Sequence, residues 1–147
     1  MRAVIQKSGK AKVEIENNIN GEINDGLVIL LGITNDDTEQ DLDFMIEKIS
    51  NLRLFEDGEK HFEKSLLETN KEALVISQFT LYASCKKGRR PDFGEAAKPE
   101  IAKPLYEKFI EKLQKKGIKV STGEFGAMMY VSLTNEGPIT IILDSKL

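Results

Sequence analysis

Histidine and cysteine are nearly absent from this chain of 147 residues, which contains one of each, His61 and Cys85. Zinc sites take three or four protein ligands, so a zinc site built from cysteine and histidine is excluded. A Ser-His-acid triad would have to use His61. Because His61 lies between charged neighbours, we interpret it as a surface side chain. A single cysteine cannot form an internal disulfide, which agrees with a reducing compartment.

Long apolar runs and nucleotide-binding motifs are also missing. No apolar run approaches the roughly 18 residues of a membrane span, and the first residues enter a strand pattern at once, so we expect no signal peptide and a cytoplasmic location. Neither G-x-x-x-x-G-K-[ST] nor G-x-G-x-x-G occurs. A content of 40% apolar and 31% charged residues predicts one globular domain over residues 1–147.

Excess positive charge is absent overall, since the formal net charge is −3. This balance argues against a protein that coats nucleic acid through its overall field. Locally, Lys86, Lys87, Arg89 and Arg90 put four positive charges into five residues around Gly88. Two interpretations stay open for this run: a solvated loop without a partner, or a loop that contacts phosphate.

Apolar alternation predicts short strands at residues 3–6, 11–15 and 19–23, with a tight turn at Asn17-Asn18 between the last two. The continuous apolar run 27–33 predicts a central strand covered on both faces. Further strands are predicted at 73–76, 119–121, 128–133 and 139–143. Strands at both ends of the chain with helices between them indicate an α+β fold.

Two helices are predicted between these groups of strands. The first has Asp36 as its N-cap with Glu39 three residues on, followed by apolar residues at 42, 45, 46, 49 and 52. The second has Pro99 in its first turn and Gly117 as its C-terminal cap, with an apolar stripe at 101, 102, 105, 109 and 113. Lysines at 112, 115 and 116 suit its C-terminal dipole.

Two segments place polar and backbone-special residues where a core would take apolar ones. Ser77-Gln78-Phe79-Thr80-Leu81-Tyr82 follows the buried strand 73–76, and loops at strand ends often carry function. Near the C-terminus, Gly137-Pro138 interrupts two strand-like runs, although Asn-Glu-Gly-Pro also forms ordinary turns. The first segment has no carboxylate and the second has only Glu136, which reads as a solvated turn residue. Hydroxyls, amides and backbone groups therefore remain as the available chemistry.

These segments and several others, in the same order, resemble the D-aminoacyl-tRNA deacylase family over nearly the whole chain. The matching segments are Met1 to Gln6, Gly26 to Gly32, Asn51 to Phe55, Ser77 to Tyr82, Lys87 to Phe93, Thr122 to Met129 and Asn135 to Thr140. Residues Glu59 to Lys64 depart from the family, which usually has a Gly-Lys-Met-Asn-like run there.

The resemblance implies a β-rich sandwich or pseudo-barrel with two main helices packed on one side. It also implies a homodimer that hydrolyses D-aminoacyl-tRNA to free D-amino acid and tRNA without metal or organic cofactor, rejects L-aminoacyl-tRNA, and clears glycine mischarged on alanine tRNA. The rival hypotheses are a non-catalytic module that binds tRNA 3′ ends through Lys86, Lys87, Arg89 and Arg90, and a generic esterase.

Site residues follow from the same resemblance. Ser77, Gln78, Phe79 and Thr80 would line the pocket for the terminal adenosine and the scissile ester, with backbone N–H groups near Phe79 and Thr80 as oxyanion donors. Either Thr80 is a nucleophile or the 2′-hydroxyl of the RNA helps to activate water. We favour the second, because a threonine nucleophile needs an adjacent base and the sequence offers none.

Stereochemical selection would come from a Gly137-cis-Pro138 motif that enters the active site of the partner subunit, where its carbonyls collide with an L-residue. A cis bond before proline costs only about 0.5–1 kcal/mol. Phe125 and Met129 match positions in the same pocket, and Ala102 would face it from the second helix. Taken singly, these three residues are as typical of core packing.

Overall fold

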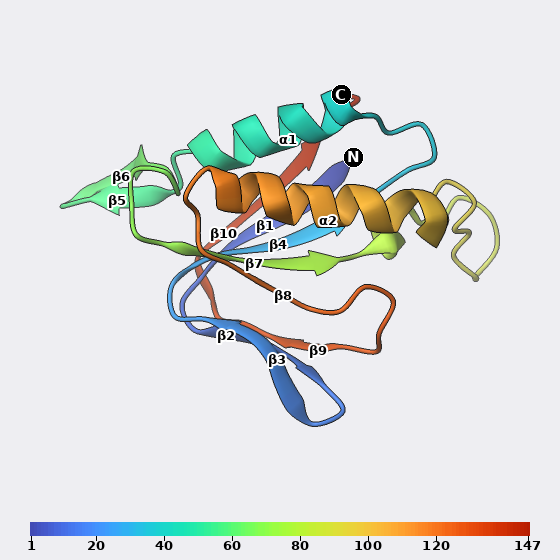
Figure 1. The fold of residues 1–147 in the computed structure, drawn as a ribbon, viewed down its shortest axis with the longest axis horizontal. Coiled ribbons are helices and arrows are strands. Elements are labelled where there is room, and N and C mark those ends of the chain that lie inside the picture. Colours follow the sequence, from blue (N-terminus) through green and yellow to red (C-terminus); the bar gives the residue numbers. More distant parts are fainter.

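Three β-sheets, two α-helices and one short 3₁₀-helix make up the computed structural model, which describes residues 1–147 (Figure 1). In chain order the elements are β1 (Arg2–Ser8), β2 (Ala11–Ile15), β3 (Asn18–Ile23), β4 (Gly26–Gly32), α1 (Glu39–Asn51), β5 (Phe55–Asp57), β6 (Lys60–Lys64), β7 (Glu72–Ser77), η1 (Phe79–Tyr82), α2 (Pro99–Lys115), β8 (Val120–Thr122), β9 (Tyr130–Ser132) and β10 (Asn135–Asp144). The largest sheet has the order β10-β1-β4-β7-β8 and the second β3-β2-β9. The predicted α+β class is confirmed.

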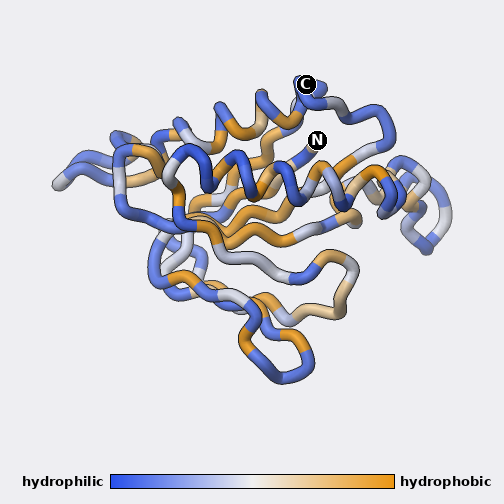
Figure 2. The backbone as a smooth tube through the Cα atoms, in the orientation of Figure 1, coloured by the Kyte–Doolittle hydropathy of each residue, from blue (hydrophilic) through white to orange (hydrophobic).

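The helices cover one face of the five-stranded sheet, and the second sheet covers part of the other (Figure 1). Strand β4 lies at the centre, as its continuous apolar run predicts. Its Leu27 and Ile29 face the helices and pack in a core with Phe109, while Val28 faces the second sheet and packs with Val13. Apolar segments accordingly gather between the layers in Figure 2. This arrangement matches the expected sandwich with two helices on one side.

Both helices occur where the sequence predicts them, with differences in detail. The N-cap of α1 is Thr38, whose backbone N–H donates to the Asp41 carboxylate at 2.8 Å, so the prediction of Asp36 was wrong. In α2, Pro99 lies in the first turn and Gly117 has φ +89°, as expected of a C-terminal cap. Neither helix is long and apolar enough to cross a membrane.

The apolar stripe of α2 differs from its prediction at one position, because Ile101 is 42% exposed and Tyr106 is buried instead. Lysines in the second half of α2 and directly after it also form ion pairs with acidic residues of α1. Lys112 contacts Glu39 and Asp43 of α1, and Lys116 Nζ lies 2.9 Å from Glu47 Oε2. These ion pairs connect the outer edges of the two helices.

Two hairpins show what local pattern missed. The β2–β3 turn uses Glu16 and Asn17, both with positive φ as a tight hairpin turn requires, instead of Asn17-Asn18. The β5–β6 hairpin projects from the layered body (Figure 1) and was not predicted, because its short, mostly exposed strands carry no apolar alternation. His61 lies on exposed β6, in agreement with its interpretation as a surface residue.

Gly137-Pro138 lies in a bulge within β10 and does not end the strand. Gln6 of β1 pairs with Thr140 and Ser8 pairs with Asn135, so the single residue Lys7 faces the four residues 136–139. The Gly137-Pro138 peptide bond is cis, as the family resemblance implied. Both residues are exposed, on a strand at the edge of the five-stranded sheet.

Candidate active site

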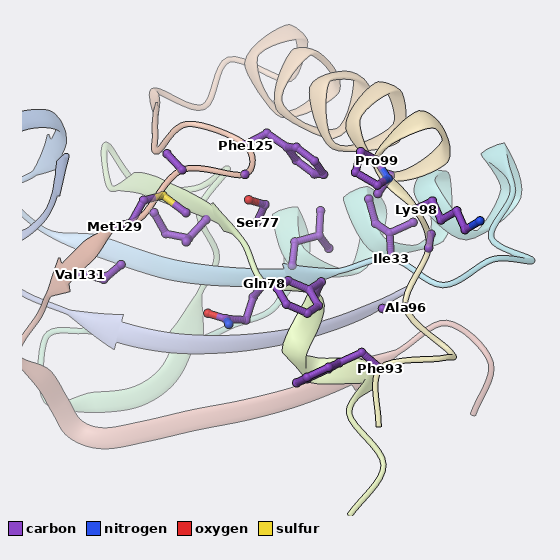
Figure 3. Close-up of a pocket in the computed structure, with 17 residues that line it drawn as sticks. Ile33, Ser77, Gln78, Phe93, Ala96, Lys98, Pro99, Phe125, Met129 and Val131 are labelled. Carbon is purple, nitrogen blue, oxygen red and sulfur yellow. The ribbon is translucent and has the colours of Figure 1, made fainter. Parts of the chain in front are cut away.

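A pocket of about 560 Å³ opens where the parallel strands β4 and β7 end (Figure 3). Leu31 and Ser77 are register partners at this edge, and both line the pocket. The carboxyl ends of adjacent parallel strands are a common position for ligand sites, because the following loops diverge there. Of the 17 lining residues 12 are hydrophobic, so the pocket is apolar with few polar groups.

Six of the predicted site residues meet in this pocket. They are Ser77 at the end of β7, Gln78 and Phe79 after it, Ala102 on α2, and Phe125 and Met129 on the segment between β8 and β9. In Figure 3, Phe125 lies beneath α2, and Met129 lies to the left of Ser77. Segments that are far apart in the sequence thus form one concave surface.

The wall beside Phe125 is fixed by Tyr106. The Tyr106 hydroxyl donates to the Val75 carbonyl at 3.0 Å, and the rings of Tyr106 and Phe125 lie 5.8 Å apart between centroids. Burial raises the pKa of Tyr106 to about 12, so it remains a neutral donor at physiological pH. Gly123 sits against Met129, and a Cβ there would overlap the Met129 sulfur. The glycine therefore allows Met129 to occupy the pocket wall.

The turn η1 leaves two backbone donors free beside the pocket. The Gln78 N–H donates to Leu31 O at 2.8 Å, and the Leu81 N–H donates to Gln78 O at 3.2 Å. Phe79 and Thr80 are the first residues of η1, so their N–H groups have no acceptor within that helix, and they donate in none of the hydrogen bonds of turns, loops and side chains. A Cβ on Gly32 would lie 3.0 Å from Gln78 O, so glycine allows this turn to pack closely on the end of β4.

Arg2 secures the other end of η1, a role that the sequence analysis did not identify. Its Nη1 donates to Leu81 O at 2.8 Å, its Nε to Asp144 Oδ2 at 2.9 Å, and its guanidinium lies 4.6 Å from the Tyr82 ring centroid. Although burial opposes the shift, hydrogen bonds from the Lys146 N–H and from Arg2 hold the pKa of Asp144 below its usual value. The turn that carries the free N–H groups is thus anchored to β1 and β10.

Thr80 does not line the pocket, and its side chain is exposed. Its Oγ1 accepts a hydrogen bond from Gln78 Nε2 at 2.5 Å. Within the pocket, Lys98 is the one titratable side chain among the lining residues. Gln78 is the one hydrogen-bond partner of the Thr80 hydroxyl, and an amide cannot act as its general base.

The basic residues Lys86, Lys87, Arg89 and Arg90 lie outside the pocket, on an exposed loop. The base of this loop is closed by two hydrogen bonds between the backbones of Ser84 and Asp92, at 2.7 and 2.9 Å. None of the four basic side chains forms an ion pair with a carboxylate of the chain. Their positive charge is available to an external anion.

Gly137 and Pro138 lie at the opposite end of the sheet from the pocket. The distance between the pocket and the bulge follows from strand β1, whose Ala3 pairs with Leu31 at the pocket and whose Ser8 pairs with Asn135 beside the bulge. Five residues of extended strand span roughly 17 Å at about 3.3 Å per residue. The Gly137-Pro138 bulge therefore does not reach the pocket of its own chain.

Among the pocket residues that sequence reasoning did not assign to the site are Phe93 and Lys98. Phe93 belongs to one of the segments that carry the family resemblance, which was a signal, but no role was assigned to it. Lys98 precedes the predicted helix start at Pro99, and nothing in its local sequence indicates a pocket. No group of three or more histidine, cysteine, aspartate or glutamate side chains lies together in a way that could hold a metal ion.

Comparison with known proteins agrees with this geometry. The family described as D-Tyr-tRNA(Tyr) deacylase matches residues 4–144. D-aminoacyl-tRNA deacylases from Clostridioides difficile (strain 630) and Thermosipho africanus (strain TCF52B) are 54% and 53% identical over 146 residues, covering 99% of this chain and 98% of each relative.

Among solved structures, one titled "c-Myc DNA Unwinding Element Binding Protein" is 40% identical with a TM-score of 0.92, and 98% of each chain is covered. A probable eukaryotic D-amino acid tRNA deacylase has the same fold, with a TM-score of 0.85 at 16% identity and 97% of each chain covered. The chain therefore belongs to the D-Tyr-tRNA(Tyr) deacylase family of hydrolases.

Proposed function

We propose that this protein hydrolyses the ester of D-aminoacyl-tRNA to free D-amino acid and tRNA, and that the pocket at the ends of β4 and β7 is its active site. The observation that carries the proposal is the pair of free N–H groups at Phe79 and Thr80, beside an apolar pocket of a size suited to a small ligand. Donors held in place before reaction stabilise a developing oxyanion without reorganisation. An aminoacyl ester is already activated, so such stabilisation lowers its barrier directly.

In this mechanism the pocket holds the terminal adenosine and presents the ester carbonyl to the N–H groups of Phe79 and Thr80. One donor of this kind is worth about 2.7–4 kcal/mol, or roughly a hundred- to a thousandfold in rate. The substrate's own 2′-hydroxyl assists the attacking water, because the lining residues include no histidine or carboxylate. Ser77 and Gln78 position the substrate at the strand end, and the Thr80 side chain is secondary.

Chiral selection is assigned to Gly137 and Pro138 of the partner subunit in a homodimer. Support comes from their place at the far end of the sheet, from their exposure, and from the absence of a neighbour beyond β10. Ile142 on β10 is 72% exposed, so this edge strand has apolar surface that a second copy would cover. A wall that excludes an L side chain still admits glycine, so glycine mischarged on alanine tRNA is a further substrate.

The remaining tRNA is bound through the exposed loop that carries Lys86, Lys87, Arg89 and Arg90, whose charges have no partner within the chain. A protein of net charge −3 needs such a local cluster to attract phosphate. The substrate and the free Cys85 both agree with a cytoplasmic location.

Release of amino acid from D-Tyr-tRNA and from L-Tyr-tRNA tests the activity. The enzyme should release D-tyrosine and leave the L-ester intact. A binding module would retard both tRNAs in a mobility assay without releasing either amino acid, and a generic esterase would cleave small activated esters as readily as the charged tRNA.

Mixed dimers test the shared site. One variant, Ala102→Phe, fills the pocket from α2, and the other, Gly137→Ala, changes the bulge at a residue with φ +108°, where a Cβ would also lie 2.8 Å from Ile139 Cγ1. If pocket and bulge come from different subunits, subunit exchange between the two inactive variants restores about a quarter of the sites, because half of the dimers are mixed and each has one intact site. No recovery in confirmed mixed dimers would mean that each chain uses its own bulge.

A further inference from the structure

We propose that the pocket mouth contains a second nucleotide subsite, in which the base that precedes the terminal adenosine stacks on Phe93 and its phosphodiester binds Lys98. This inference rests on the proposed function and extends it from the reacting nucleotide to the one before it. Both residues line the pocket, yet both are exposed, so they lie where an enclosed ligand meets solvent.

Phe93 provides a preformed aromatic platform. Its ring is 40% exposed and contacts that of Phe79 edge to face, with centroids 5.1 Å apart and an interplanar angle of 64°. The local backbone is held by hydrogen bonds from the Gly94 N–H to Asp92 Oδ1 at 2.9 Å and from the Ala96 N–H to Phe93 O at 3.0 Å. Proteins that bind single-stranded nucleic acid use such rings for base stacking, worth about 1–3 kcal/mol per base.

Lys98 provides an unpaired cation at the mouth of the same pocket, five residues further along the chain. It is the one charged side chain among the 17 lining residues, and no carboxylate lies within ion-pairing distance of it. All five lysines within α2 or directly after it are paired with acids: Lys103, Lys108, Lys112, Lys115 and Lys116. In Figure 3 the Lys98 side chain points away from Ser77 and Met129, toward the outside. A cation so placed suits a phosphodiester that leaves the pocket.

The volume and the course of the chain indicate the same subsite. A pocket of about 560 Å³ has room for a ligand of the size of an aminoacyl-adenosine, so the preceding nucleotide must lie outside it. The segment from Phe93 to Lys98 connects the pocket with the basic loop 86–90 and is tied to the end of β4 by the Ala97 N–H, which donates to Ile33 O at 2.9 Å. An RNA strand can follow this segment from the pocket toward the basic loop.

Two substrates isolate the subsite. D-Tyrosyl-adenosine fills the pocket alone, whereas the D-tyrosyl ester of cytidylyl-adenosine adds one base and one phosphodiester. We expect the dinucleotide ester to have a kcat/KM about tenfold or more higher, mainly through KM, since one stacked base and one phosphate contact are gained. Phe93→Leu and Lys98→Gln should each shrink this preference severalfold, whereas Phe93→Tyr and Lys98→Arg should retain it. Lys103→Gln, on the next turn of α2, is the matched control and should keep the full preference.

The outcomes separate this inference from the proposed function. A parent enzyme that hydrolyses both esters with equal kcat/KM overturns the subsite and leaves the deacylase proposal intact. Equal slowing of both substrates by Phe93→Leu and Lys98→Gln also overturns it, because those residues would then act on the pocket itself. A parent enzyme that hydrolyses neither these esters nor D-Tyr-tRNA overturns the deacylase proposal.

Discussion

Replacing Thr80 by valine removes one hydroxyl and keeps the side-chain shape and the backbone N–H. The Thr80 Oγ1 accepts a hydrogen bond from Gln78 Nε2 at 2.5 Å and forms none with a histidine, carboxylate or amine. An amide is not basic enough to take a proton from the hydroxyl, so Thr80 lacks the activation that a nucleophile needs. We therefore expect Thr80→Val to lose only what this hydrogen bond contributes to the position of η1.

The magnitude follows from that contact. A side-chain hydrogen bond contributes about 0.5–1.5 kcal/mol, so deacylation should fall by a factor of roughly two to ten. Removal of a covalent nucleophile is far more damaging, on the order of a millionfold in a serine protease. The two mechanisms thus differ by several orders of magnitude in one measurement.

Single-turnover release of labelled D-tyrosine from D-Tyr-tRNA is the suitable assay, because it measures chemistry apart from product release. Thr80→Ser, which keeps the hydroxyl, is the matched control. A tRNA that ends in 2′-deoxyadenosine should react at least about a hundredfold more slowly with the parent enzyme, since the proposed proton carrier is missing. A loss beyond a thousandfold in Thr80→Val, or an acyl-enzyme trapped by acid quench, would refute this reasoning.

Four further outcomes are expected. His61→Ala should keep deacylation within a few-fold, because His61 lies exposed on β6 away from the pocket; a loss beyond about a hundredfold would show general base catalysis. Serine at Lys86, Lys87, Arg89 and Arg90 should weaken tRNA binding and flatten its salt dependence without changing the D-over-L ratio, and unchanged binding would show a merely solvated loop. Thr140→Val should shrink the D-over-L ratio, because Thr140 Oγ1 accepts hydrogen bonds from Asn135 Nδ2 at 2.8 Å and from Gln6 Nε2 at 3.3 Å beside the Gly137-Pro138 bulge. Thr140→Ser is the control, and equal D-over-L ratios for the two variants would contradict a role of these hydrogen bonds in holding the bulge. In urea unfolding, the free energy of unfolding should decrease as the pH falls below about 3.8, because the pKa of Asp144 is lowered from that value in the folded state and its charged form stabilises the fold. Asp144→Asn should reduce this acid sensitivity, and an unchanged pH profile would count against a stabilising role of the Asp144 carboxylate.

Elements with strong periodicity could be predicted from the amino-acid sequence alone. Buried β4, the end of β7 before the candidate-site segment, and the α2 boundaries at Pro99 and Gly117 were all predicted, because each depends on residues that are close in the chain. The first helix was also predicted, with its cap misplaced at Asp36. Both Asp36 and Thr38 have an acidic residue three positions on, so the spacing alone does not decide which of them caps the helix. The β5–β6 hairpin was not predicted because, apart from the buried Phe55, its short strands are mostly exposed and carry no apolar alternation.

How these segments lie relative to one another depends on long-range pairing and packing, which no local pattern reveals. Ser77, Ala102 and Phe125 share one pocket because β4 pairs with β7 in parallel while α2 packs above them, a register that no local pattern contains. The antiparallel register of β1 places Gly137-Pro138 at the far end of the sheet. Strand pairing and packing join residues a hundred positions apart, and their energies depend on those distant neighbours, so the places of Phe93 and Lys98 at the pocket mouth emerge only when the chain is folded.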